Sequence, residues 1–316
     1  MVLSSTTRSG FRLVRLALLA ALAVVVGATP SPAQLAVEGT TTVLRSGVVR
    51  GVDAAFDPST GTYMVVGAQD SVFAVCTDAS GAATSGVITI KPPNGVVSNK
   101  PFGSFPRVRY VQDLNGGAGA FIVIWQQEEV VGAPQMHSRL VSCTAGLLGT
   151  DQVISGGSPP WTDYGASSFA YSPTSQKFLV AWKAWAGTGY RMVARLMDLN
   201  GAGVGSVVTL STEFARDPGV AWNSSLNEFG VSFSGEAANG RDGYSVFVRM
   251  PADNPAGFSR TTFNSVPGCI TTTTDLAYNP DTQRYIMTWW QGCGAATKVA
   301  EFDGVGTLQT IGLVSS

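Results

Sequence analysis

The stretch Tyr171–Trp182 reads Tyr-Ser-Pro-Thr-Ser-Gln-Lys-Phe-Leu-Val-Ala-Trp. It combines an aromatic residue, a turn with serine and proline, and a second aromatic residue that opens an apolar run. The template recurs at Phe56–Val66, Trp222–Phe233 and Tyr278–Trp289, with the two aromatic residues always seven positions apart. A fifth copy, Tyr110–Trp125, carries four extra residues in its turn, within Asp113–Gly117. The first aromatic residues fall at positions 56, 110, 171, 222 and 278, so the sequence predicts five repeats.

Each repeat continues with a second apolar stretch, a glycine turn and a short last strand. Val72–Val75 precedes Asp78-Ala79-Ser80-Gly81, and Met192–Leu196 precedes Asp198-Leu199-Asn200-Gly201. Four short strands in a unit of about 50 residues are typical of a propeller blade, which buries both faces of its sheet. The sequence therefore predicts an all-β protein, a five-bladed β-propeller of four-stranded antiparallel blades. The Asp-x-x-Gly segments are either calcium loops or hairpin turns with a left-handed glycine, and their few carboxylates favour plain turns.

These motifs resemble those of exported bacterial propeller-repeat proteins, whose units read aromatic-Asn-Pro, a short turn, Tyr-Leu-Val-x-Trp and then Asp-x-x-Gly. The resemblance covers roughly residues 50 to 316. It implies a fold rather than a reaction, although some propellers of this kind bind glycans. The tryptophan of the second strand is replaced by Gly67 in unit one and by Phe233 in unit four. This departure implies that those two blades pack somewhat differently.

The N-terminus has the pattern of a secretory signal peptide. Three arginines, Arg8, Arg12 and Arg15, precede the apolar run Leu16–Val26, and Ser31-Pro32-Ala33 offers a cleavage site after Ala33. A membrane anchor is the alternative, but this run has 11 residues, whereas a spanning helix needs about 20. The pattern predicts a signal peptide at 1–33 and a secreted or periplasmic chain that does not insert into a membrane.

Composition excludes several classes of protein. With 20 basic and 21 acidic side chains, the net charge of -1 is unlike that of a nucleic-acid-binding protein. The single histidine, His137, rules out a multi-histidine metal site, and we expect it to be structural on the third strand of unit two. No phosphate loop or dinucleotide motif is present, so we expect no cofactor and no metal. The oligomeric state does not follow from the sequence.

The mature chain is predicted to be one domain, 34–316, with blades near 50–97, 105–155, 164–212, 216–265 and 270–316. Residues 34–49 include Thr40–Leu44, which looks like a last strand that completes blade five. Leu308–Leu313 already supplies such a strand, so one of the two is surplus. The surplus segment is an outer strand, a dimer contact or a frayed end.

Four cysteines in an exported chain predict two disulfides, with three possible pairings. Cys269 and Cys293 flank the first two strands of unit five, so they can form a short staple on one blade. Cys76 and Cys143 end the third strands of adjacent units. This second pairing crosses between blades and requires Cα atoms within about 7 Å.

Two sets of loops define the loop face of the propeller: those entering the innermost strands and those joining the second and third strands. Both emerge at the same end of the blades, where propeller function usually lies. Aromatic and charged side chains on these loops suit a carbohydrate or a cell-surface ligand. The candidates are Trp185, Trp161, Tyr164, Trp290, Arg107 and Asp217. Trp161 and Trp290 can equally cover blade edges, whereas Trp185 lies beside a glycine-rich loop with little core to bury it.

Three further side chains occupy one register of the innermost strands. Asp53, Arg107 and Asp275 each lie three residues before the first aromatic residue of a unit. In a closed ring Asp275, Asp53 and Arg107 would form an arc at the channel, which is the raw material for glycoside hydrolysis. A structural arc is the alternative. The sequence thus leaves two functions, with a secreted propeller that binds a glycan or a surface partner preferred over a glycosidase-like hydrolase that uses Asp53 and Asp275.

Overall fold

The computed structural model describes residues 49–92, 105–130, 133–155, 162–187, 189–237 and 243–315. The chain divides into two compact units, Met1–Thr41 and Thr42–Ser316. The described residues all belong to the second unit and begin at residue 49, so the signal peptide and the strand expected at Thr40–Leu44 lie outside them. Within these ranges the protein is built from strands and two short 3-10 turns, Asn115–Gly117 and Pro255–Gly257. No helix in this part of the chain is long and apolar enough to cross a membrane.

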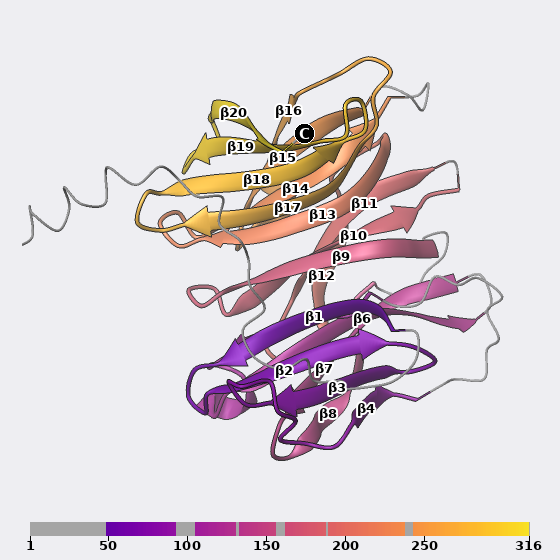
Figure 1. The fold of residues 1–316 in the computed structure, drawn as a ribbon, viewed down its shortest axis with the longest axis vertical. Helices are drawn as coiled ribbons and strands as arrows, with labels where there is room; N and C mark the ends of the chain where they lie inside the picture. Colours follow the sequence, from indigo (N-terminus) through magenta and orange to yellow (C-terminus); the bar gives the residue numbers. More distant parts are fainter. Residues whose placement is uncertain are drawn as a thin grey trace, which may run out of the picture. The chain divides into compact units, whose positions relative to one another are not determined.

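In the described part of the chain, twenty strands form five antiparallel sheets of four, and each sheet takes its strands in sequence order (Figure 1). This is the predicted five-bladed β-propeller. Blade one contains β1 (Arg50–Asp57), β2 (Thr62–Ala68), β3 (Val72–Thr77) and β4 (Ile88–Lys91). Blade two contains β5 (Arg107–Val111), β6 (Ala120–Val130), β7 (Ala133–Ser142) and β8 (Gly146–Val153). Blade three contains β9 (Thr162–Ser172), β10 (Lys177–Trp185), β11 (Tyr190–Met197) and β12 (Gly203–Thr209). Blade four contains β13 (Phe214–Asn223), β14 (Glu228–Glu236), β15 (Gly243–Pro251) and β16 (Ser259–Phe263). Blade five contains β17 (Thr271–Asn279), β18 (Arg284–Gln291), β19 (Ala296–Asp303) and β20 (Leu308–Ser315).

The two aromatic residues of each repeat face each other across the first hairpin of a blade. The directly opposed pairs are Phe56–Tyr63, Tyr110–Phe121, Tyr171–Phe178, Trp222–Phe229 and Tyr278–Tyr285. Cross-strand aromatic pairs of this kind stabilise an antiparallel sheet and fix its register. In four blades the turn between them is capped by the polar residue after the first aromatic, whereas blade two has Val111 at that position. Asn279 Oδ1, for example, accepts the backbone N–H of Asp281 at 2.9 Å.

The Asp-x-x-Gly segments are plain turns. Asp78 Oδ1 accepts the backbone N–H groups of Ser80 and Ala82 at 2.8 and 3.0 Å, and Asp198 and Asp303 make the equivalent bonds. The glycine of each turn has a positive φ, which is 83° at Gly81. Because the carboxylate of each aspartate accepts hydrogen bonds from the backbone of its own turn, these residues build hairpins, as the sequence predicted.

Four hydrophobic clusters hold consecutive blades together. They join blades one and two, two and three, three and four, and four and five. None of the four clusters combines described residues of blade five with those of blade one. The contact between blades one and five that a closed ring requires therefore stays a prediction.

The second-strand aromatic residues lie inside these clusters. Trp125, Trp182 and Trp289 are buried, and Phe233 is buried at the equivalent position of blade four. In blade one that position is Gly67, where a Cβ atom would lie 2.8 Å from the ring of Phe73. Phe73, from the neighbouring strand β3, thus occupies the space that a larger side chain would need.

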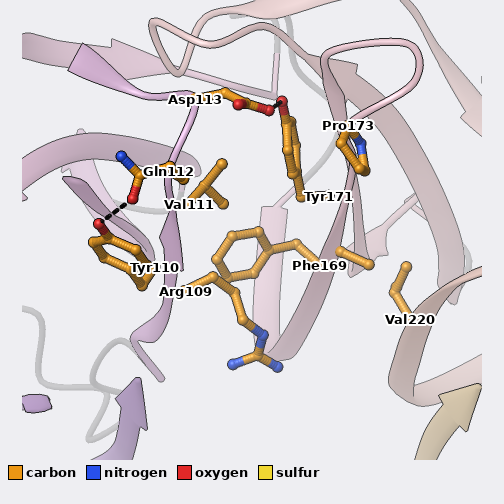
Figure 2. Close-up of a pocket in the computed structure, with 10 residues that line it drawn as sticks. Arg109, Tyr110, Val111, Gln112, Asp113, Phe169, Tyr171, Pro173 and Val220 are labelled. Atoms are coloured by element: carbon orange, nitrogen blue, oxygen red, sulfur yellow. Dashed lines mark hydrogen bonds between the residues drawn. The ribbon is translucent and has the colours of Figure 1, made fainter. Parts of the chain in front are cut away.

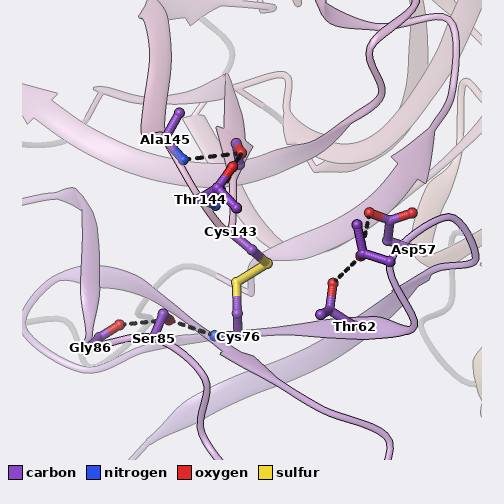
Figure 3. The surroundings of a disulfide bond; sticks show 10 residues. Asp57, Thr62, Cys76, Ser85, Gly86, Cys143, Thr144 and Ala145 are labelled. Carbon is purple, nitrogen blue, oxygen red and sulfur yellow. Dashed lines mark hydrogen bonds between the residues drawn. A yellow bond between two sulfur atoms is a disulfide. The ribbon is translucent and has the colours of Figure 1, made fainter.

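Both predicted disulfides are present. Cys76 and Cys143 join the ends of β3 and β7, with Cα atoms 5.8 Å apart, and so tie blade one to blade two (Figure 3). Cys269 and Cys293, with Cα atoms 5.4 Å apart, staple the loop before β17 to the turn after β18. The first bridge connects two blades, whereas the second constrains one end of a single blade.

A buried histidine supports the same junction between blades one and two. His137 lies on β7, the predicted third strand, and its ring stacks on Trp125 with ring centroids 5.6 Å apart. Its Nδ1 lies 3.0 Å from Asp151 Oδ1 on β8, and Lys91 of β4 donates to Asp151 Oδ2 at 3.3 Å. The expectation that His137 is a structural residue is consistent with these contacts.

We expect this junction to weaken in acid. Partial burial acts to raise the pKa of Asp151, but the hydrogen bond from His137 and the charges of His137 and Lys91 outweigh it, so the pKa falls below its usual 3.8. A carboxylate with a lowered pKa stabilises the fold above the pKa of the unfolded chain, and this stability is lost as pH falls through the folded pKa. In chemical unfolding between about pH 6 and pH 2, the difference in stability between the wild type and Asp151→Asn should narrow as pH falls. A constant difference across this range would contradict the prediction.

Candidate functional site

Five side chains gather on the loop face where blades three and four meet, and we call them the aromatic–cation cluster. They are Lys183, Trp185, Tyr190, Phe214 and Arg216. The rings of Trp185 and Tyr190 pack edge to face with centroids 4.9 Å apart, and Tyr190 packs in the same way on Phe214 at 5.4 Å. Lys183 Nζ lies 4.6 Å from the centroid of Tyr190, and Arg216 Cζ lies 4.7 Å from that of Phe214. All five side chains are partly buried.

Backbone geometry explains how the cluster forms. Trp185 and Tyr190 are opposite each other at the ends of β10 and β11, so the hairpin itself places the two rings in contact. Phe214 and Arg216 begin β13, which has an irregular register between Arg216 and Gly219. Asp217 lies in this bulge with φ at 47°, a left-handed conformation that aspartate tolerates better than most residues. Bulges of this kind re-aim side chains beside functional sites.

The charges in and around the cluster nearly balance. Arg216 Nη2 pairs with the buried Glu236 Oε1 at 2.9 Å. Burial lowers the pKa of Lys183, and the neighbouring Arg216 adds to this effect, while the charge of Asp217 opposes it. Half-buried aromatic rings beside charged planar groups can stack on the apolar face of a sugar and hydrogen-bond its hydroxyl groups.

Among the other predicted ligand-binding residues, Trp290 and Arg107 are not brought into this cluster. Trp161 lies outside the described residues, and Tyr164 lies on β9 without a described side chain. Trp290 is on β18 of blade five and is 40% exposed. Arg107 begins β5, where its Nε donates to the carbonyl of Ser167 at 3.1 Å. Among the candidates whose side chains the structure describes, Trp185 alone lies within the cluster, with Asp217 beside Lys183.

The predicted arc of Asp53, Arg107 and Asp275 has the expected register but not the expected contacts. The three residues oppose Val66, Ile124 and Thr288, which are equivalent positions of the second strands. Yet no hydrogen bond or ion pair among the described residues joins any two of them. Arg107 turns to blade three through Ser167, and Asp275 is exposed with Oδ1 accepting its neighbour's backbone N–H.

Asp53 has a different cationic partner from the one expected. Its Oδ2 accepts the backbone N–H of Val108 at 3.0 Å and Nη1 of Arg109 at 3.1 Å. Side chains alternate along a strand, so Arg107 and Arg109 lie on the same side of β5, but Arg109 is two residues nearer the strand's far end. Asp53 therefore pairs with Arg109 and not, as the sequence predicted, with Arg107.

A pocket that the sequence analysis did not foresee lies next to Arg109 (Figure 2). It has a volume of about 480 Å³ and is lined chiefly by Arg109, Tyr110, Gln112, Asp113, Phe169 and Tyr171. These residues come from the C-terminal halves of β5 and β9 and from the segment that follows β5. The pocket is thus nearer the turn end of the blades, where first and second strands join, than the loop face.

A comparison of the repeats singles out two of the residues that line this pocket. The residue before the first aromatic is alanine in four units, at Ala55, Ala170, Ala221 and Ala277, but it is Arg109 in unit two. The same unit carries the insertion that contains Asp113. The sequence predicts ligand-binding residues instead on the opposite, loop face of the blades.

No protein-family model matches the chain, and no similar curated protein is found. Among solved structures, an N-acetylgalactosamine deacetylase from F. plautii is 12% identical, with a TM-score of 0.49, and the match covers 83% of this chain and 85% of that one. An exo-beta-1,3-galactanase from Phanerochaete chrysosporium is 10% identical, with a TM-score of 0.46 and coverages of 84% and 66%. The Dos1 propeller gives 10% identity, a TM-score of 0.46 and coverages of 82% and 57%. Similarity at this level carries no argument about activity, so the function has to be inferred from the site itself.

Proposed function

We propose that this protein is an exported, non-catalytic propeller that binds a glycan through the aromatic–cation cluster on its loop face. The observation that best supports this proposal concerns Trp185. Its ring is half-buried against the ring of Tyr190, and Lys183 lies over that tyrosine ring. A ring held in this way loses little side-chain freedom on binding, so more of the stacking energy appears as affinity. The adjacent Arg216, whose side chain is 34% exposed, supplies hydrogen-bond donors for hydroxyl groups.

Binding is preferred to glycoside hydrolysis because of the contacts that the candidate catalytic carboxylates make. Hydrolysis needs two carboxyl groups about 5 to 9 Å apart across an open cleft. Asp53 accepts hydrogen bonds from Val108 and Arg109. Asp275 is exposed, and its Oδ1 accepts the backbone N–H of Leu276. No hydrogen bond or ion pair among the described residues joins the two carboxylates, so their contacts do not favour an acid–base pair.

Trp185→Ala should weaken glycan binding at least about tenfold, because a rigid aromatic anchor is replaced by a methyl group. The measurement is a glycan array followed by calorimetric titration of the best ligand. Phe56→Ala is the matched control, because it removes an exposed ring from the turn end of blade one. It should bind like the wild type.

Unchanged binding by Trp185→Ala would contradict the proposed site. A reducing-sugar release assay on the same ligand separates the two functions. Release of sugar that is abolished by Asp53→Asn would overturn the binding proposal in favour of a hydrolase.

A further inference from the structure

We propose that the pocket beside Arg109 is a second saccharide site, which takes a neutral ring with several hydroxyl groups. It lies towards the turn end of the blades, so the protein would hold glycans at two separate places. This inference goes beyond the proposed function, because it does not depend on the aromatic–cation cluster.

Both departures of unit two from the repeat template line this one pocket. Arg109 replaces the alanine of the other four units, and the insertion adds Asp113. The insertion is firmly anchored, because Leu114 is fully buried and joins the cluster between blades two and three. A repeat that serves only to build a blade has no need of either change, whereas a binding site needs polar groups at fixed positions.

Arg109 is held on three sides while part of its guanidinium stays open. Nη1 donates to Asp53 Oδ2 at 3.1 Å and to the carbonyl of Val108 at 2.7 Å, and Cζ lies 5.4 Å from the centroid of Phe169. No described residue accepts a hydrogen bond from Nε or Nη2, and the side chain is 43% exposed. Figure 2 shows the guanidinium extending past the edge of the Phe169 ring. Two donors on a positioned planar group remain available for hydroxyl oxygens.

The opposite wall of the pocket supplies an acceptor and aromatic surface. Tyr171 donates its hydroxyl to Asp113 Oδ2 at 2.5 Å, which fixes the carboxylate and leaves Oδ1 without a described donor (Figure 2). Burial, with the contact to Asp113, raises the pKa of Tyr171, so this hydroxyl stays a donor at neutral pH. The rings of Tyr110 and Tyr171 are both half-buried, and Tyr110 is tied to Gln112 at 2.9 Å.

Charge and size together indicate the class of ligand. Arg109 and Asp113 are the charged side chains among the lining residues, so the lining has a formal charge of zero and gives an anionic ligand no net attraction. A cationic ligand would be repelled by the positively charged guanidinium of Arg109. Neutral hydroxyl groups can accept from Arg109 and donate to Asp113 at once, and the volume of about 480 Å³ suits one or two sugar rings.

The test is NMR of the 15N-labelled protein, with methyl β-galactopyranoside, methyl β-glucopyranoside and methyl α-mannopyranoside titrated to about 50 mM. At least one should shift the Nε–Hε resonance of Arg109. Arg109→Ala, which restores the alanine of the other repeats, should weaken binding of that sugar at least about tenfold. Arg107→Ala is the matched control on the same strand, because Arg107 does not line the pocket. Thermal melting of both variants checks that they fold.

Arg109→Lys provides a second variant that keeps the positive charge but loses the planar fork, and it should also bind more weakly. Trp185→Ala should leave this binding unchanged, so failure of the loop-face site and failure of this pocket are distinguishable. Three results would overturn the proposal: no response to any of the three sugars, unchanged binding by Arg109→Ala, or tighter binding of galacturonate than of methyl β-galactopyranoside.

Discussion

Removal of the Cys76–Cys143 disulfide by the double substitution Cys76→Ala/Cys143→Ala should lower the free energy of unfolding by about 4 kcal/mol. The two cysteines are 67 residues apart in sequence. In the chain-entropy model a bridge across so long a segment strongly restricts the unfolded chain. The bridge also lies at the ends of the third strands of adjacent blades. Its removal therefore affects the hydrophobic cluster between blades one and two. Denaturant unfolding followed by tryptophan fluorescence measures the change.

The second disulfide serves as the internal control. Cys269 and Cys293 are only 24 residues apart, so Cys269→Ala/Cys293→Ala should cost less, about 3.5 kcal/mol in the same model. The first variant should also unfold at a lower denaturant concentration than the second, because only the first removes a link between blades. A larger loss from the second variant would contradict the entropic explanation and point to contacts on the loop face instead.

The fold could be predicted from the sequence because its signal is repeated five times. Any one aromatic pair is weak evidence, but four pairs at one spacing and a fifth with a four-residue insertion require a common structural cause. The structure supplies it, since each pair is directly opposed across the first hairpin of a blade, as Tyr171 and Phe178 are. The disulfides followed from the same alignment, because Cys76 and Cys143 occupy equivalent strand ends.

The pocket could not be predicted in the same way, because a repeat template emphasises what the units share. Arg109 and Asp113 are informative only as departures from that template. The partner of Asp53 was likewise out of reach, since a shared register on neighbouring strands does not say which way a long side chain turns. Arg107 reaches the carbonyl of Ser167 on blade three, and Arg109 reaches back to blade one.

Trp182→Ala should destabilise the protein by about 3 to 5 kcal/mol, the range for truncation of a large buried aromatic side chain. Trp182 is 2% exposed and lies in the cluster between blades two and three. Trp185, three residues along β10, is only partly buried, so Trp185→Ala should cost much less in denaturant unfolding. The pair therefore separates the core role of one tryptophan from the proposed binding role of the other.

Trp182→Phe is the decisive companion, because the protein already contains this substitution in blade four. Phe233 occupies the equivalent position there and is fully buried. If the position requires only a large apolar ring, Trp182→Phe should recover most of the stability that Trp182→Ala loses, with a remaining cost of about 1 to 2 kcal/mol for the smaller volume. If instead Phe and Ala are equally destabilising at position 182, each blade has a packing arrangement specific to its own aromatic residue. In that case the five repeats share a backbone register but not an interchangeable core.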